Sequence, residues 1–278
     1  MSSSPKYQYE NLKVHIYPEG VAHVELYRPK RLNAINEALV EDIRVCFNTL
    51  GQDSTIRAII LSGHGRTFTS GIDFKDNFLM KGEPDTDVAR RAYTKRLHIE
   101  WFQSAMSALE KCPQPVIVAM HYGVYGVAVD LCTAGDIRYG TKDSFYTVKE
   151  VDLGLAPDVG TLQRLPKVIG SDSLARELCF TGRNMYADEA YKCGLISKLF
   201  DTKEEMIEDA LKTARVIASK SPVAVVSSKH LLNYSRDHSV DEGLQYTAVW
   251  NSAMLQTEDI PKSIQGFMQK KPAHYSNL

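Results

Sequence analysis

Residues 129–165 of this chain read VDLCTAGDIRYGTKDSFYTVKEVDLGLAPDVGTLQRL. This stretch places three carboxylates, Asp130, Glu150 and Asp158, among apolar residues and glycines, whereas most other acids stand in mixed charged segments. Apolar surroundings shift the pKa of a carboxyl group, so that it can donate or accept a proton near neutral pH. The stretch therefore predicts proton-transfer chemistry.

The composition is that of an ordinary globular protein of 278 residues, 44% hydrophobic and 24% charged. This length allows a large domain with a sizeable core. The formal net charge of -1 gives no overall basic field that would gather nucleic acid or an anionic membrane. No apolar run reaches the ~20 residues that cross a bilayer. We therefore expect neither nucleic acid nor a membrane as a partner.

The cysteines and the two ends of the chain indicate in which cellular compartment the protein is expected. The five cysteines are odd in number and include no CxxC pair, which disfavours a disulfide framework or a structural zinc site. Residues 1–14 lack the apolar core of a secretory signal and the arginines of a mitochondrial transit peptide. Ser276, Asn277 and Leu278 resemble the SKL-type peroxisomal address. We expect import into peroxisomes through this address, and a cytoplasmic or mitochondrial location otherwise.

Short apolar runs alternate with helical patterns in the first part of the chain. The expected strands cover residues 14–17, 22–27, 58–61, 116–120, 137–139 and 144–146. The expected helices cover residues 36–50, 87–111 and 128–134, with a glycine-containing turn at 122–126. Such alternation predicts parallel crossover units and an α/β fold.

The later part of the chain is mostly helical in pattern. The expected helices there cover residues 188–193, 203–219, 222–236, 241–255 and 261–270. We divide the chain into an α/β core that carries the site, residues 1–200, and a helical C-terminal region, residues 201–278.

Five separated segments agree in order and spacing with one known family. They read RPKRLNAIN (28–36), RTFTSGIDF (66–74), HYGVYGVAVDLCTAGD (121–136), EVDLGLAPDVGTLQRL (150–165) and GRNMYADEAYKCGL (182–195). Over residues 10–272 the chain thus resembles the enoyl-CoA hydratase/isomerase (crotonase) superfamily. The resemblance implies a spiral of ββα units, a C-terminal helical region used for trimerisation, an acyl-CoA substrate, and a homotrimer or dimer of trimers.

The resemblance also implies an oxyanion hole made of two backbone N–H groups. The donors would be Ile72, after Gly71, and Val127, after Gly126. Preorganised donors of this kind stabilise the negative charge that develops on a thioester oxygen. Val127 departs from the family, which usually has glycine there; its branched side chain should narrow the acyl pocket, and the alternative is that it damages the hole.

The three acids distinguish among members of the superfamily. Asp130, Glu150 and Asp158, with KEVD and DVGTLQRLPKVIG around the latter two, resemble the Δ3,5-Δ2,4-dienoyl-CoA isomerases of fatty-acid β-oxidation. By this resemblance Glu150 would take the C2 proton, Asp158 would deliver a proton at C6, and Asp130 would orient or tune the pair. The alternatives are an enoyl-CoA hydratase or 3,2-enoyl-CoA isomerase, and a non-catalytic RNA-binding homologue. Mixed charges in residues 203–219 disfavour RNA binding.

Each acid also has a structural interpretation by itself. Asp130 suits the first turn of a helix, Glu150 a surface ion pair with Lys149, and Asp158 the N-cap of a helix that begins near Val159. Their joint match to the family positions favours catalysis.

The resemblance implies further contacts with coenzyme A. The predicted binding residues are Lys30, Arg31, Ala34, Ser70, Gly71, Asp73 and Gly126, together with Phe267 and Lys270, which often come from a neighbouring subunit. No metal and no separate cofactor are implied, because coenzyme A is part of the substrate.

Overall fold

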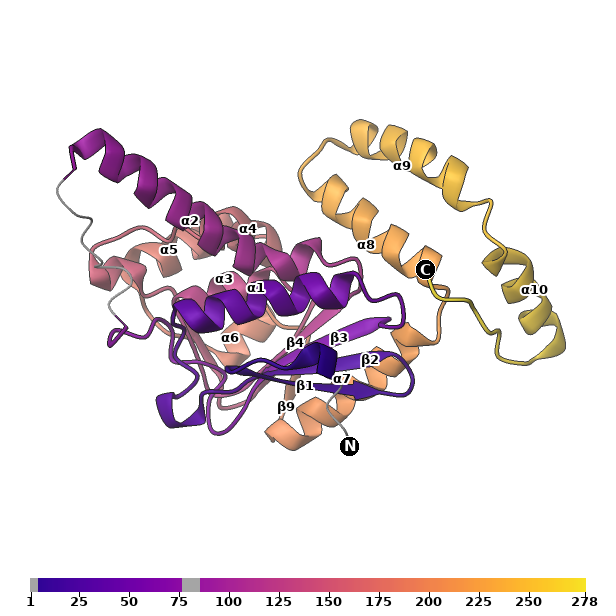
Figure 1. Cartoon of the computed structure of the whole chain (residues 1–278), viewed down its shortest axis with the longest axis horizontal. Coiled ribbons are helices and arrows are strands. Elements are labelled where there is room, and N and C mark those ends of the chain that lie inside the picture. Colours follow the sequence, from indigo (N-terminus) through magenta and orange to yellow (C-terminus); the bar gives the residue numbers. More distant parts are fainter. Residues whose placement is uncertain (1–4, 77–85) are drawn as a thin grey trace.

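The computed structural model of the protein describes residues 5–76 and 86–278 (Figure 1). Six strands form the central sheet in the order β1 (Leu12–Tyr17), β2 (Val21–Leu26), β3 (Ala58–Gly63), β4 (Val116–Met120), β6 (Ile137–Thr141) and β9 (Lys198–Phe200). β1 and β2 form an antiparallel hairpin, and all later neighbours in this sheet are parallel. The parallel crossover units expected from the sequence are therefore confirmed.

Helices cover both faces of the central sheet, because its inner strands are apolar on both faces. Every residue of β3 and β4 is buried, as is typical of parallel strands. On one face, α1 (Glu37–Gly51), α2 (Val88–Lys111) and α3 (Val127–Thr133) enclose the larger hydrophobic core. On the other face, α7 (Lys203–Ala218) packs through the small or flexible side chains of Met206, Ala210, Ala214 and Ala218.

A second sheet of three strands lies beside the first. It contains β5 (Gly123–Tyr125), β7 (Phe145–Thr147) and β8 (Met185–Tyr186), in that order. Successive turns of the chain give one strand to each sheet and then a helix, as in β4-β5-α3 and β6-β7-α4 (Thr161–Ile169). α5 (Asp172–Thr181) and α6 (Ala187–Lys192) follow and lead into β9. This arrangement confirms the expected spiral of ββα units.

The segment 122–126 differs from the sequence prediction, which was a turn throughout. Residues 123–125 form β5, which pairs in parallel with β7 much later in the chain. Val124 is fully buried, and Gly126, with φ of 52°, then turns the chain into α3. The strand is stabilised by this distant pairing, and three residues are too few to show the alternation of a strand.

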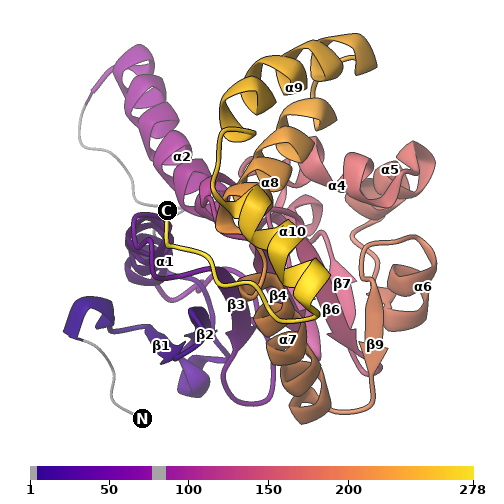
Figure 2. The same cartoon turned by 90° about the vertical axis from the view of Figure 1, so that its right-hand side faces the viewer.

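The C-terminal helices α8 (Pro222–Arg236), α9 (Val240–Met254) and α10 (Asp259–Gln269) project from one side of the core (Figures 1 and 2). Lys229 anchors α8, since its ammonium lies 2.7 Å from Asp136 and donates to the carbonyls of Leu109 and Gln114. The division at residue 200 stays a prediction: α7 packs on the central sheet, whereas α8–α10 extend from it.

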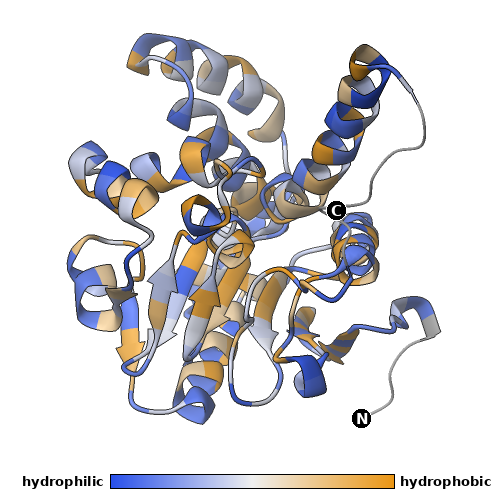
Figure 3. Cartoon of the chain, turned by 90° about the vertical axis from the view of Figure 1, so that its left-hand side faces the viewer, coloured by the Kyte–Doolittle hydropathy of each residue, from blue (hydrophilic) through white to orange (hydrophobic). Residues whose placement is uncertain are grey.

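Hydropathy follows this layering. Hydrophobic residues gather in the strands of the central sheet, while the outer helices mix hydrophilic and hydrophobic residues (Figure 3). Within residues 5–76 and 86–278, no helix combines the length and the apolar character that crossing a membrane requires.

Candidate active site

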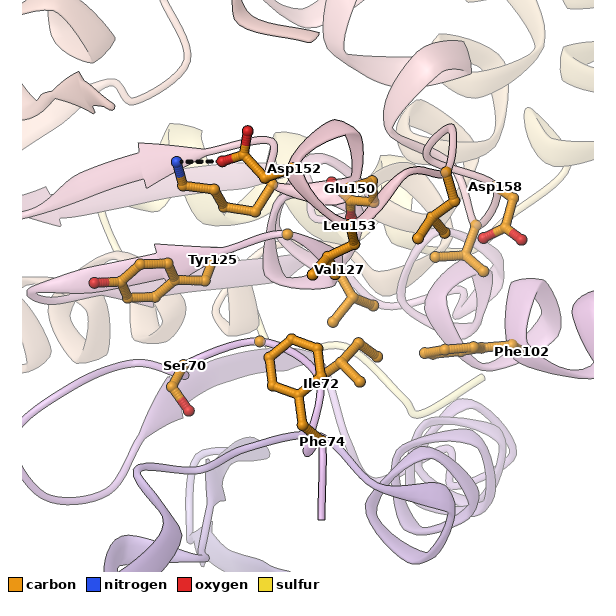
Figure 4. A pocket seen from close by; sticks show the side chains of 15 residues that line it. Ser70, Ile72, Phe74, Phe102, Tyr125, Val127, Glu150, Asp152, Leu153 and Asp158 are labelled. Atoms are coloured by element: carbon orange, nitrogen blue, oxygen red, sulfur yellow. Dashed lines mark hydrogen bonds and ion pairs between the residues drawn. The ribbon is translucent and has the colours of Figure 1, made fainter. Parts of the chain in front are cut away.

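A cavity of about 380 Å³ lies between the segment after β3, the β5–α3 junction, the 3₁₀ helix η4 (Glu150–Leu153) and α2 (Figure 4). Most of its wall is apolar, formed by Ile72, Phe74, Phe102, Val127, Leu153, Leu155 and Val159. Its polar side chains are Ser70, Tyr125, Lys149, Glu150, Asp152 and Asp158. An apolar cavity with a few polar groups is typical of a small-molecule site.

Parallel pairing of β5 with β7 brings Glu150 to this cavity. The two strands end in register at Tyr125 and Thr147, so the segments that follow them emerge at the same sheet edge. The Gly126 N–H donates to the Thr147 carbonyl at 2.8 Å, which ties the turn before α3 to the end of β7. A Cβ on Gly126 would lie 3.2 Å from Oε1 of Glu150. Glycine at this position therefore makes room for the carboxylate.

We expect Gly126→Ala to lower turnover by roughly 10- to 100-fold, because the new methyl group would displace the Glu150 carboxylate. The positive φ of 52° should also cost about 1–3 kcal/mol of unfolding free energy. Gly154→Ala is the matched control, since Gly154 has a φ of 78° but no atom of the described residues lies within 4 Å of an added Cβ. Thermal melts and steady-state rates check both variants; equal rate losses would contradict the steric account.

The two predicted oxyanion donors, Ile72 and Val127, also lie at the cavity. Ile72 forms a parallel bridge with Ile35, in which the Ile35 N–H donates to the Gly71 carbonyl and the Asp73 N–H to the Ile35 carbonyl. The N–H of Ile72 itself therefore points away from Ile35. Val127 is the first residue of α3, where an N–H has no partner within the helix. The side chains of Ile72 and Val127 face each other across the cavity (Figure 4).

Glu150 has the environment expected of a proton-transfer group. Its Oε2 atom is buried and has no hydrogen-bond partner among the described residues. Desolvation by burial raises the pKa of Glu150, and the negative charge of Asp158 raises it further. Like charges in one cavity disfavour simultaneous ionisation, so an ionised Asp158 makes it harder for Glu150 to lose its proton.

Asp158 lies at the rim of the cavity, at the end lined by Phe102 (Figure 4). Its side chain is exposed there, yet desolvation of the carboxyl still raises its pKa. The N–H of Asp158 and electrostatic interactions with His98 and Lys95 on α2 act in the opposite direction and lower this pKa. An acid at such a rim can reach the cavity and exchange protons with solvent.

Asp130 lies behind the cavity and is not part of its lining. It is 0% exposed, and its Oδ1 accepts a hydrogen bond from the N–H of Thr161, the first residue of α4. Its Oδ2 is buried without a hydrogen-bond partner in the described part of the chain. Desolvation, followed by the charge of Glu150, raises the pKa of Asp130 to about 7. Asp130 is therefore coupled electrostatically to Glu150, whose charge favours the protonated form of Asp130.

The raised pKa of Asp130 predicts a pH-dependent stability. Between the usual pKa near 3.8 and the folded value of about 7, the native protein keeps a proton that the unfolded chain has released. The free energy of unfolding therefore falls as pH rises through this window, by about 4 kcal/mol. Asp130→Asn should remove this fall and leave the variant more stable than wild type at pH 8. Denaturant titrations from pH 4 to 8 measure it, with the exposed Asp172→Asn as control; identical slopes in Asp130→Asn and wild type would contradict it.

The comparisons with known proteins agree with this geometry. The sequence profile of the enoyl-CoA hydratase/isomerase family matches residues 17–277. The chain belongs to the enoyl-CoA hydratase/isomerase family. The family resemblance and the fold class expected from the sequence are therefore confirmed.

Two relatives and one solved structure illustrate the family. The chain is 52% identical over 266 residues to Delta(3,5)-Delta(2,4)-dienoyl-CoA isomerase, mitochondrial, of Rattus norvegicus, which covers 95% of this chain and 81% of the relative. It is 39% identical over 261 residues to the peroxisomal protein of the same name from Arabidopsis thaliana, covering 93% and 94%. The crystal structure of enoyl-CoA hydratase from Bacillus anthracis superposes with a TM-score of 0.85 at 27% identity, covering 96% and 99%.

In this member of the enoyl-CoA hydratase/isomerase family, Ser70, Gly71 and Gly126 line the cavity, and their contact with the substrate stays a prediction. Lys30 and Arg31 are exposed in the short helix η2 (Pro29–Arg31), outside the cavity lining. Ala34 is buried and its carbonyl accepts a hydrogen bond from Arg28. Arg28 also lies 3.0 Å from Asp73, so Asp73 fixes the segment that carries Ile72 rather than lining the cavity.

Phe267 and Lys270 lie at the end of α10, which is on the opposite side of the molecule from α5 (Figure 1). Phe267 is 87% exposed, and neither residue lines the cavity of its own chain. Their predicted contact with coenzyme A therefore requires a second subunit.

The sequence reasoning missed the apolar wall and one ion pair. Phe74, Phe102 and Val159 resemble core residues in the sequence, and nothing in their local pattern distinguishes a cavity wall from a core. The Lys149 ammonium lies 2.8 Å from Asp152 and donates to the Gly182 carbonyl at 2.6 Å. The i,i+3 spacing of Lys149 and Asp152 was the available signal.

No group of three or more His, Cys, Asp or Glu side chains within residues 5–76 and 86–278 is arranged to hold a metal ion. That the reaction needs no metal and no separate cofactor stays a prediction.

Proposed function

We propose that this protein is a Δ3,5-Δ2,4-dienoyl-CoA isomerase of fatty-acid β-oxidation, which moves a proton from C2 to C6 of its substrate. The observation that supports it most is a single apolar cavity lined by two carboxyl groups with raised pKa, Glu150 and Asp158. The names of relatives at 52% and 39% identity agree.

In the proposed complex, the thioester oxygen lies between the N–H groups of Ile72 and Val127. Loss of the C2 proton gives a dienolate whose charge is spread over this oxygen and the conjugated chain. The two donors stabilise that charge, and removal of such a donor typically lowers the rate by about 10²–10³-fold. Val127 donates through its backbone, while its side chain narrows the cavity opposite Ile72.

Glu150 is the proposed base at C2. Its carboxylate lies against Gly126, next to the Val127 N–H, so the base and the oxyanion donor act on neighbouring substrate atoms. The unpaired Oε2 atom is free to take the proton. The raised pKa makes the carboxylate a stronger base than an exposed glutamate.

Asp158 is the proposed acid at C6. It lies at the end of the cavity lined by Phe102, beyond Glu150 (Figure 4). The proton goes from its carboxyl to C6, and the dienolate electron pair forms the new C–H bond. Mutual repulsion disfavours ionisation of both carboxyls together, in line with a reaction that needs one base and one acid, and the charge of Glu150 raises the pKa of buried Asp130.

A hydratase is the main alternative, since solved relatives carry that name. Water addition needs two acids around a water molecule at C2–C3. Asp130 does not line the cavity, and its Oδ1 is occupied by the Thr161 N–H, so Asp130 is not placed to serve as the second acid beside Glu150. The RNA-binding alternative gains no support from α7, where Lys212 pairs with Glu208 and Arg215 with Glu19.

The test of the proposed function is an assay with a 3,5-dienoyl-CoA substrate. We expect growth of the absorbance of a 2,4-diene conjugated with the thioester. Water addition to a 2-enoyl-CoA and 3,2-isomerisation are measured in parallel. If either parallel reaction is much faster than dienoyl isomerisation, the proposed function is wrong.

The proposed assembly is a homotrimer or a dimer of trimers. Helices α8–α10 expose large apolar side chains that a neighbouring copy would cover: Leu232, Val240, Leu244, Val249, Leu255, Phe267 and Met268. In such an assembly Phe267 and Lys270 of a neighbour, with Lys30 and Arg31, would contact the nucleotide end of coenzyme A. Analytical ultracentrifugation tests this; a monomer at micromolar concentration would contradict it.

Relatives of this chain are named mitochondrial or peroxisomal, and of these two locations the proposed one is the peroxisome. The residues Ser276 and Asn277 of the predicted address lie against Arg57, whose guanidinium donates to the Ser276 carbonyl at 3.2 Å and to Asn277 Oδ1 at 2.9 Å. An import receptor would have to displace these hydrogen bonds to read Leu278. Imaging of an N-terminally labelled protein with and without residues 276–278 tests the address; an unchanged distribution would contradict it.

A further inference from the structure

The segment that carries Asp158, residues 154–160, has a glycine at each end, so its own sequence restrains its backbone only weakly. It runs from Gly154, where η4 ends with φ of 78°, to Gly160, where α4 is preceded by φ of 139°. Glycine at both ends allows many conformations of the segment between them. Pro157 and Val159 are buried, while Asp158 between them is exposed at the rim. The position of Asp158 must therefore be set largely by contacts from outside the segment.

One such contact comes from α2. Nε2 of Gln103 donates a hydrogen bond of 2.7 Å to the backbone carbonyl of Asp158, across 55 residues of sequence. Phe102, the preceding residue on α2, is buried and forms the cavity wall at the same end (Figure 4). Lys95, His98 and Phe102 follow one another on α2 at i,i+3 and i,i+4 spacing, and Lys95 and His98 interact electrostatically with the Asp158 carboxyl. α2 thus both holds the segment, through Gln103, and forms the wall that it faces.

We propose that Gln103 is a positioning residue that holds Asp158 at the C6 end of the cavity. The inference rests on the proposed function. Gln103 donates its hydrogen bond to the backbone carbonyl of Asp158 and not to the side-chain carboxyl. It therefore fixes the position of Asp158 and leaves the carboxyl available for proton transfer. A misplacement of about 1 Å can lower a rate by roughly 10²-fold. Gln103 touches no reacting atom in this account.

The role of Gln103 predicts that its removal separates the two halves of the reaction. Glu150 is carried by η4 and positioned by the β5–β7 pairing, so C2 deprotonation does not depend on Gln103. Proton delivery at C6 does depend on it, because it needs Asp158 in place. If Gln103 only stabilised the fold, its replacement would lower the rates of C2 deprotonation and of proton delivery at C6 together.

The experiment compares wild type with Gln103→Leu, which keeps the bulk of the side chain and removes the N–H donor. Two rates are measured: isomerisation of a 3,5-dienoyl-CoA, and exchange of its C2 hydrogens with D₂O, followed by NMR. We expect isomerisation to fall by roughly 10- to 100-fold while C2 exchange stays at the wild-type rate. Gln163→Leu is the matched control, an exposed glutamine on α4 that does not line the cavity, and should change neither rate.

Unchanged isomerisation in Gln103→Leu would overturn the inference, and so would equal losses in isomerisation and C2 exchange. Because Gln103 is exposed, its replacement should leave the thermal melt near that of wild type. If wild type isomerises the substrate and Gln103→Leu does so at the same rate, the positioning role of Gln103 is wrong but the proposed function stands. A wild type that neither isomerises the substrate nor exchanges its C2 hydrogens would remove the proposed function as well.

Discussion

Glu150→Gln is expected to lower the isomerisation rate by on the order of 10³-fold or more, because an amide cannot take the C2 proton. The change keeps the size of the side chain and removes its charge. Since burial disfavours the ionised form of Glu150, the neutral variant should be at least as stable as wild type at pH 8. Diene absorbance gives the rate, and thermal melts give the stability.

Asp152→Asn is the matched control for Glu150→Gln. Asp152 also lines the cavity, but its carboxylate is paired with Lys149 at 2.8 Å and is not available as a base. Its replacement should change the rate of isomerisation far less than Glu150→Gln does. Comparable losses in the two variants would mean that the general charge of the cavity matters and that Glu150 has no specific role.

Asp158→Asn is expected to lower isomerisation by about 10²–10³-fold while C2 exchange into D₂O continues. The variant keeps Glu150 and both oxyanion donors, so the dienolate still forms and returns to the starting material. Only the delivery of a proton at C6 is lost. NMR of the recovered substrate detects deuterium at C2, and the diene absorbance follows the product.

Asp158→Glu provides the control, because it keeps a carboxyl group at the same rim position and should recover part of the lost rate. If Asp158→Asn isomerises at the wild-type rate, Asp158 is not the acid. If it stops C2 exchange as well, the two carboxyls do not act at separate ends of the substrate.

The fold could be predicted where local sequence and tertiary contacts agree. Residues 116–120 form a continuous apolar run, and the structure has β4 there because both faces are buried. α5 lies in the part of the chain that was expected to be mostly helical, although no separate range was predicted for it, and β8 was not predicted because it has only two residues. α4 contains Pro166 inside the helix, which disfavours helix in a sequence reading, yet packing of Leu165 and Ile169 against the core holds it.

The candidate site could be predicted only where chemistry marks the residue. Carboxylates among apolar residues are conspicuous, and Glu150 and Asp158 do line one cavity. Phe102 and Gln103 lie in the middle of a long helix, where an apolar residue reads as core and a polar one as surface. Their contacts with the Asp158 segment depend on how α2 crosses the fold, which no local pattern encodes.

The most direct test of the two-carboxyl account is to run the wild-type reaction in D₂O and locate deuterium in the 2,4-dienoyl-CoA product by NMR. One group removes hydrogen at C2 and a different, solvent-exposed group supplies it at C6, so we predict solvent deuterium at C6. If the hydrogen removed from C2 is found at C6 without exchange, a single group carries it along the substrate, and the assignment of separate roles to Glu150 and Asp158 is wrong.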